Sequence, residues 1–105
     1  MWKRIKAAPG VMVPWYLMTS WLYYQRDISL LPDEEYDQLC KKLLRDFDRI
    51  EHPHKHFVDR EGLSAGTGYA IQVYPERAVQ SASLLAIEDC LVTWNPKRKQ
   101  WEKPD

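Results

Sequence analysis

The fold is decided by the stretch from Asp33 to Glu51, which reads DEEYDQLCKKLLRDFDRIE. Its apolar residues recur every three or four positions and form one stripe, as in an amphipathic helix. They are Tyr36, Leu39, Cys40, Leu43, Leu44, Phe47 and Ile50. Pro32 and the acids after it favour a helix start, and the helix should end before His52-Pro53 because a residue preceding proline avoids the helical region. The stretch therefore predicts a long helix with one buried face.

A second helix should precede this one, from Pro14 through Arg26. Proline suits the first turn of a helix, and no further breaker occurs in this segment. Its dense aromatic residues leave little polar face, so we expect neighbours to cover it on most sides. With the short connector 27–32, the two helices predict a hairpin over about residues 14–51.

The rest of the chain gives weaker signals. A third helix is expected from Pro75 through about Ile87. Beyond it, residues 91–94 and 99–101 flank a turn-like segment, which predicts an irregular or short β-hairpin C-terminus. Pro9-Gly10 marks the first ten residues as a turn or tail, and residues 54–68 resemble a loop with one helical turn around 59–63. The fold class is therefore mainly α, with a helix hairpin packed against a third helix.

Length and composition restrict the function. A chain of 105 residues suits one domain, and 15 basic against 15 acidic residues give no bulk attraction for nucleic acid. The apolar stretch Val11–Tyr24 is interrupted by Pro14 and is shorter than the ~20 residues of a membrane span, so no membrane partner is expected. Cys40 and Cys90 lie half a chain apart and suggest neither a disulfide framework nor a zinc site, which favours a cytoplasmic location.

The segment from Trp21 to Leu39 reads WLYYQRDISLLPDEEYDQL. It places an aromatic pair at a helix end, an aspartate after a two-residue spacer, and Asp-x-x-Tyr-Asp at the start of the amphipathic helix. This order resembles the N-terminal Ia subdomain of bacterial NAD-dependent DNA ligases. The resemblance runs without gaps over residues 16–51, about a third of the chain, and residues 52–105 stay unassigned.

In that family the Ia subdomain is a helical clamp that binds the nicotinamide mononucleotide half of NAD. The resemblance implies a site for NAD or nicotinamide mononucleotide formed by Tyr23, Tyr24, Asp33, Tyr36 and Asp37. These residue types suit such a ligand, because aromatic rings stack on a flat nicotinamide and carboxylates accept hydrogen bonds from ribose hydroxyls. Asp33 and Asp37 are four residues apart and share one helix face.

The chain also departs from the ligase pattern. It contains no Lys-x-Asp-Gly tetrapeptide, which supplies the ligase nucleophile, so we expect no ligation by this chain alone. The segment 50–56, IEHPHKH, resembles one in short standalone ligase-related proteins of tailed phages. The resulting hypothesis is a noncatalytic, phage-type protein that acts in the host cytoplasm.

Other interpretations stay open at this stage. The tyrosines are equally explained as core aromatics that pack without binding a ligand. The chain would alternatively be a protein-interaction factor that modulates the host ligase or inhibits a host defence complex, as anti-CRISPR proteins do. Small size and the tryptophans Trp2, Trp94 and Trp101 favour that alternative, since tryptophan is enriched at interfaces. A homo-oligomer is also compatible with this size.

The histidines His52, His54 and His56 alternate along the chain. In an extended segment they would share one side, but no fourth ligand is evident and we expect no metal. If their loop folded over the tyrosines, His54 or His56 would be an acid or base near neutral pH, which is the condition for an enzymatic role. The basic run 97–99 is expected to be a solvated tail rather than a nucleic-acid contact.

Overall fold

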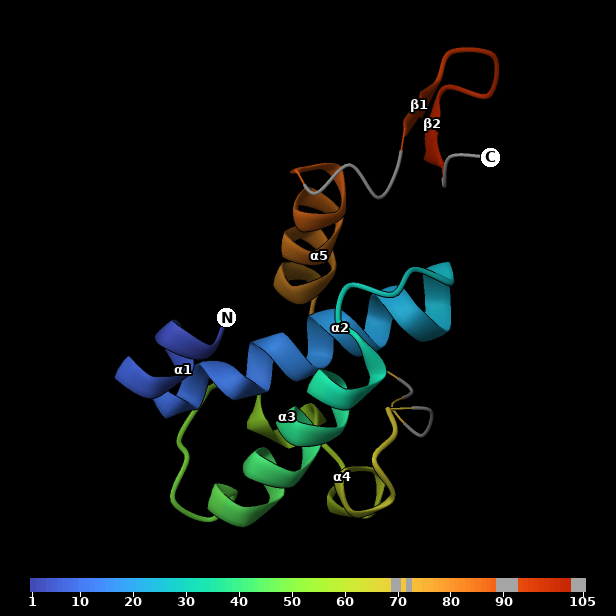
Figure 1. Ribbon diagram of the computed structural model, residues 1–105. Coiled ribbons are helices and arrows are strands. Elements are labelled where there is room, and N and C mark those ends of the chain that lie inside the picture. The colour runs from blue at the N-terminus through green and yellow to red at the C-terminus, as the bar shows by residue number, and fades with distance from the viewer. Residues whose placement is uncertain (69–70, 72, 89–92, 103–105) are drawn as a thin grey trace.

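The computed structural model describes residues 1–68, 71, 73–88 and 93–102. These residues are mainly helical, which confirms the predicted fold class (Figure 1). The helices are α1 (Trp2–Ala7), α2 (Met12–Arg26), α3 (Asp33–Asp46), α4 (Arg60–Ala65) and α5 (Glu76–Glu88). Single 3-10 turns lie at Pro9–Val11 and Lys55–Phe57. Strands β1 (Thr93–Asn95) and β2 (Gln100–Glu102) pair antiparallel, with Trp94 opposite Trp101.

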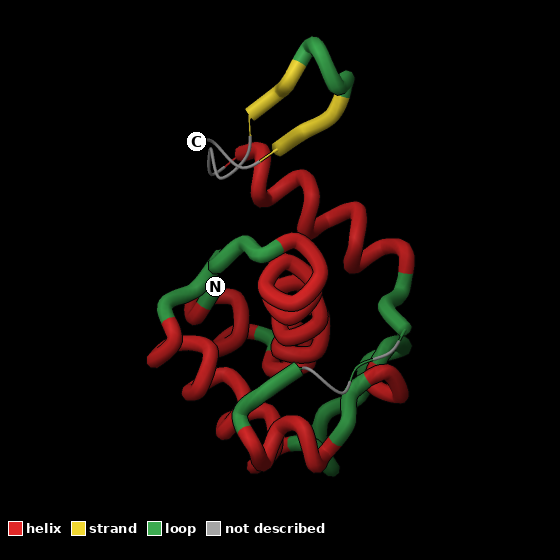
Figure 2. Tube along the Cα trace, turned by 90° about the vertical axis from the view of Figure 1, so that its right-hand side faces the viewer, coloured by secondary structure: helices red, strands yellow, loops and turns green. Residues whose placement is uncertain are grey.

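Helix α2 forms the centre of the molecule. It runs between α5 on one side and α3 with α4 on the other (Figure 1), and the view turned by 90° shows the other helices arranged around it (Figure 2). Its buried residues occupy more than one face, as expected from its aromatic and apolar density. They are Met12, Val13, Tyr16, Leu17, Met18, Thr19, Ser20 and Leu22. Burial of so many side chains makes α2 the element on which the others pack.

Helix α3 presents one apolar stripe to the core, with Leu39, Cys40 and Leu43 buried. The sequence predicted a helix to Glu51, but α3 ends at Asp46, so the prediction overran by five residues. The backbone tightens into turns there, because the N–H groups of residues 49 and 50 both donate to the carbonyl oxygen of Asp46 at 3.0 Å. Ile50 is nevertheless buried. The apolar stripe therefore predicted the burial of Ile50 correctly, although the observed helix ends four residues before it.

The N-terminal residues form helix α1 instead of the expected turn or tail. Ile5 is buried in the core, and the Trp2 ring is half-buried below the Lys42 ammonium of α3, whose Nζ lies 4.6 Å from the ring centroid. A six-residue helix is not stable on its own, so contacts with other elements must hold it. Such contacts leave no periodic signal in so short a segment.

Helix α5 closely matches its predicted range. Its small residues Ala78, Ala82 and Ala86 recur at every fourth position and are buried, and α5 packs on α2. Helix α4 occupies the position of the expected helical turn. The Asp59 carboxylate accepts the N–H of Glu61 at its start.

No helix among the described residues is long and apolar enough to cross a membrane. Cys40 is a free, buried thiol. Cys90 and residues 91–92 of the predicted hairpin lie outside the described residues.

Candidate functional site

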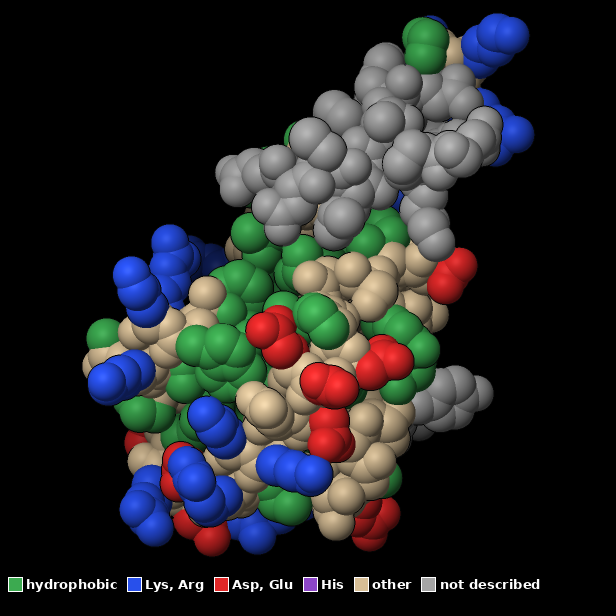
Figure 3. Space-filling model, in the orientation of Figure 1, with side chains coloured by type: hydrophobic (Ala, Val, Ile, Leu, Met, Phe, Trp, Pro, Cys, Tyr) green, Lys and Arg blue, Asp and Glu red, His purple; other side chains and the backbone are tan. Residues whose placement is uncertain are grey.

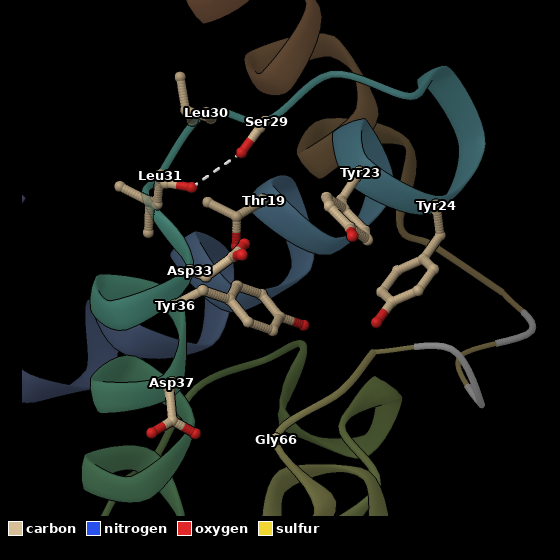
Figure 4. A pocket seen from close by; sticks show the side chains of 10 residues that line it. All are labelled: Thr19, Tyr23, Tyr24, Ser29, Leu30, Leu31, Asp33, Tyr36, Asp37 and Gly66. Carbon is tan, nitrogen blue, oxygen red and sulfur yellow. Dashed lines mark hydrogen bonds between the residues drawn. The ribbon is translucent and has the colours of Figure 1, made fainter.

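The five residues singled out by the ligase resemblance line one cavity. It lies where the end of α2, the connector and the start of α3 meet, and its volume is about 190 Å³ (Figure 4). The lining consists of Thr19, Tyr23, Tyr24, Ser29, Leu30, Leu31, Asp33, Tyr36, Asp37 and Gly66. The structure thus brings together side chains from two helices and the connector between them, with the backbone of Gly66 from the end of α4.

The connector creates the cavity by reversing the chain sharply. Asp27 ends α2 in the left-handed conformation, with φ 54°, and the next N–H, of Ile28, donates to the carbonyl oxygen of Leu22 at 2.9 Å. This bond satisfies a carbonyl at the helix end that would otherwise lack a partner. Ile28 is buried, and the Ser29 hydroxyl donates to the carbonyl oxygen of Leu31 at 2.9 Å. These contacts fix the start of α3 relative to the end of α2.

Tyr24 and Tyr36 are held by hydrogen bonds to other parts of the chain. The Tyr36 hydroxyl lies 2.7 Å from Ser20 Oγ, and the Tyr24 hydroxyl lies 2.5 Å from Thr67 Oγ1. Tyr16 donates to the Thr67 carbonyl oxygen at 2.8 Å and stacks on Tyr36 with ring centroids 6.1 Å apart. Burial raises the pKa of Tyr36 far above its usual value, so the hydroxyl stays protonated. These two site tyrosines therefore also have a structural role.

Among the three tyrosines that line the cavity, Tyr23 is the exposed one. Its side chain is 50% exposed, and its ring packs at 77° against Tyr24 with centroids 4.9 Å apart. An edge-to-face pair holds the ring in place and leaves part of its surface uncovered. Figure 4 shows both rings beside the cavity.

Two carboxylates supply the charge of the cavity. Asp33 is exposed in the first turn of α3, and the half-exposed Asp37 pairs with Lys41 at 2.9 Å. An exposed ion pair of this kind contributes little to stability, so a ligand that approaches Asp37 can replace it at small cost. Among the residues that the structure describes, no lysine or arginine lines the cavity. Acidic side chains also gather over the middle of this face of the molecule (Figure 3). The cavity therefore favours a group that is neutral or positively charged.

Two glycines shape the cavity, and the sequence predicts only a loop for their segment. Gly66 has a φ of 70°, and a Cβ there would lie 3.1 Å from Asp37 Oδ1. A Cβ on Gly68 would lie 2.6 Å from Ser20 Cβ and 2.9 Å from the Tyr36 hydroxyl oxygen. The absence of side chains lets this loop approach the cavity closely. Two glycines in three residues are the only sequence signal for such an approach.

The histidines lie elsewhere, which removes the condition for the enzymatic hypothesis. His52 and His54 line a different groove, with Pro14 and Met18 of α2, and none of the three histidines lines the tyrosine-aspartate cavity. Among the described residues, no group of three His, Cys, Asp or Glu side chains is arranged to hold a metal ion. The cavity thus has aromatic rings and carboxylates but no imidazole.

No protein-family model, curated protein or solved structure matches this chain. Function is therefore inferred from the chemistry of the cavity and from the resemblance of residues 21–39.

Proposed function

We propose that the protein is a noncatalytic module that binds the nicotinamide mononucleotide part of a nicotinamide nucleotide in the α2–α3 cavity. One observation supports this proposal above all others. Tyr23, Tyr24, Asp33, Tyr36 and Asp37, chosen from the sequence pattern, all line the same cavity. A motif that served helix packing alone would not require its two aspartates to border a shared hollow with the tyrosines.

The chemistry of the lining matches the ligand. An oxidised nicotinamide ring is planar and carries a positive charge, so the uncovered face of Tyr23 would attract it by stacking and by a cation–π interaction. Asp33 and Asp37 would accept hydrogen bonds from the ribose hydroxyls and offset the charge of the ring. Lys41, which pairs with Asp37, would be available as a cation for the phosphate.

The size of the cavity limits what it encloses. Its volume of about 190 Å³ is smaller than the roughly 300–1,000 Å³ of pockets for drug-sized ligands. A nicotinamide ring would be enclosed, its ribose would lie at the mouth of the cavity, and the adenylate half of NAD would extend outside. We therefore expect weak, millimolar binding, which corresponds to about 4 kcal/mol.

Calorimetric titration with nicotinamide mononucleotide tests the proposal. Tyr23→Ala and Asp37→Asn should each weaken binding about fivefold to tenfold, or ~1–1.4 kcal/mol, because each removes one accessible contact. Glu34→Gln is the matched control, since this exposed acid lies in the same turn of α3 and does not line the cavity. The reduced mononucleotide, whose ring is uncharged, should bind more weakly than the oxidised form. Equal weakening by Glu34→Gln, or no heat at millimolar ligand, would contradict the proposal.

A protein-interaction role is the second candidate, supported by apolar side chains that the fold leaves uncovered. Leu84 of α5 is 60% exposed and Val73 is 64% exposed, whereas Trp2 is half-buried below Lys42. The structure does not describe the side chains of Trp94 and Trp101. Sedimentation with a purified bacterial NAD-dependent ligase would test one such partner. A complex lost on Leu84→Asp would favour this role, and sedimentation of two separate species would exclude this partner.

A further inference from the structure

A second groove lies between the loop after α3, the start of α2 and the start of α5. It is lined by His52 and His54 of the loop, Pro14 and Met18 of α2, and Arg77 and other residues of α5, and its volume is about 330 Å³. It shares no lining residue with the tyrosine-aspartate cavity. The groove is thus separate from the tyrosine-aspartate cavity.

Helix α5 contributes two hydrogen-bond donors to this groove. Arg77 and Ser81 are four residues apart, so they share one face of the helix, and both are exposed. Among the described residues neither side chain takes part in a hydrogen bond or ion pair. The guanidinium group keeps its charge at every accessible pH, and it lies in the first turn, where the helix dipole also favours an anion.

The loop contributes imidazole donors. The backbone N–H of His54 donates to His52 Nδ1 at 3.0 Å, so neutral His52 carries its proton on Nε2. The two rings pack edge to face with centroids 5.4 Å apart. Burial, and then the neighbouring His54, lowers the pKa of His52, which therefore donates as a neutral ring near pH 7.

We infer that this groove binds a small organic anion, with the anionic group on Arg77, Ser81 and the imidazoles and an apolar body against Pro14 and Met18. Among the described residues, no aspartate or glutamate lines the groove, so none of them competes for Arg77 there. A cationic ligand would meet the charge of Arg77 without a carboxylate to offset it. Phosphate and carboxylate share the required chemistry, and a dianion gains more from the guanidinium than a monoanion does.

Amide chemical shifts in the NMR spectrum distinguish these ligands. Phenyl phosphate should shift the amides of residues 52, 54, 77, 78 and 81 in a saturable way and bind more tightly than benzoate, which has the same ring but one charge. Benzoate binding as tightly would reassign the ligand to carboxylates. Benzylamine, the cationic counterpart, should leave these amides unchanged. Shifts of equal size from benzylamine would overturn the inference.

Two variants test the role of the arginine. Arg77→Gln should weaken phenyl phosphate about tenfold, because the charge-assisted hydrogen bonds are lost. Arg4→Gln is the control, since Arg4 is exposed on α1 and does not line the groove. The helical circular dichroism of both variants should match that of the parent chain. Unchanged affinity in Arg77→Gln would contradict the inference, whatever nicotinamide mononucleotide does at the other cavity.

Discussion

Gly68 determines how closely the loop after α4 approaches the floor of the tyrosine-aspartate cavity. An alanine Cβ there would lie 2.6 Å from Ser20 Cβ and 2.9 Å from the Tyr36 hydroxyl oxygen, closer than packed atoms tolerate. Gly68→Ala should therefore lower the free energy of unfolding by about 1–3 kcal/mol, as overpacking of a core does. Urea unfolding measures this loss. Ser64 is exposed on α4, so Ser64→Ala should change the free energy of unfolding by no more than about 0.5 kcal/mol. An equal loss of stability in the two variants would contradict the close packing of Gly68.

The sequence could predict only some residues of the cavity. Five of them, Tyr23, Tyr24, Asp33, Tyr36 and Asp37, follow from a local motif. The hydrogen bonds that support the tyrosines come from residues far away in the chain. The Tyr16–Thr67 hydrogen bond joins residues 51 positions apart, and the Tyr24–Thr67 bond spans 43. Such contacts leave no spacing pattern in a single sequence.

At the scale of elements, the packing of α5 on α2 depends on small side chains. Ala82 is fully buried, so Ala82→Leu should push the two helices apart and cost about 1–3 kcal/mol. Leu84 provides the control on the same helix, because it is 60% exposed and Leu84→Ala should change stability by less than about 0.5 kcal/mol. Thermal unfolding followed by circular dichroism compares the two variants. A larger loss for Leu84→Ala would contradict this packing.

Sequence patterns predicted elements well where a long apolar stripe or a proline marked them. The hairpin helices and α5 were expected close to their observed ranges. Local patterns were insufficient at α1, which depends on the burial of Ile5, and at the end of α3, where residues after Asp46 keep their apolar burial but form turns. Periodicity reports which side chains are buried, and it does not report how the backbone hydrogen bonds continue.

At the scale of the whole molecule, a cysteine thiol and three tyrosine hydroxyls that are shielded from solvent make the free energy of unfolding fall at alkaline pH. Burial raises the pKa of Cys40 to about 11 and of Tyr74 to about 12, and it raises the pKa values of Tyr16 and Tyr36 further. When the pH exceeds the ordinary pKa values of cysteine and tyrosine, the unfolded chain releases these protons, whereas the folded chain still holds them. Stability should therefore be independent of these groups below about pH 8.5 and fall as pH rises toward 12.

Alkaline titration checks this dependence through two signals. Tyrosinate absorbance of the buried residues should appear together with the loss of helical circular dichroism, because ionisation requires unfolding. Tyr36→Phe removes one of these protons and should make the fall of stability with pH less steep. Complete tyrosinate formation in a protein that keeps its helical signal would show that the hydroxyls are not held by burial.

The most direct test of nicotinamide binding is an NMR titration of the labelled protein with nicotinamide mononucleotide. Saturable shifts at millimolar ligand should be largest for the amides of residues 23–24, 29–31, 33, 36–37 and 66, which border the α2–α3 cavity. Nicotinamide riboside, which lacks the phosphate, should shift the same amides and leave residues 77–81 unaffected. Shifts confined to residues 52–54 and 77–81, or none at all, would contradict the assignment of the cavity to the nicotinamide ring.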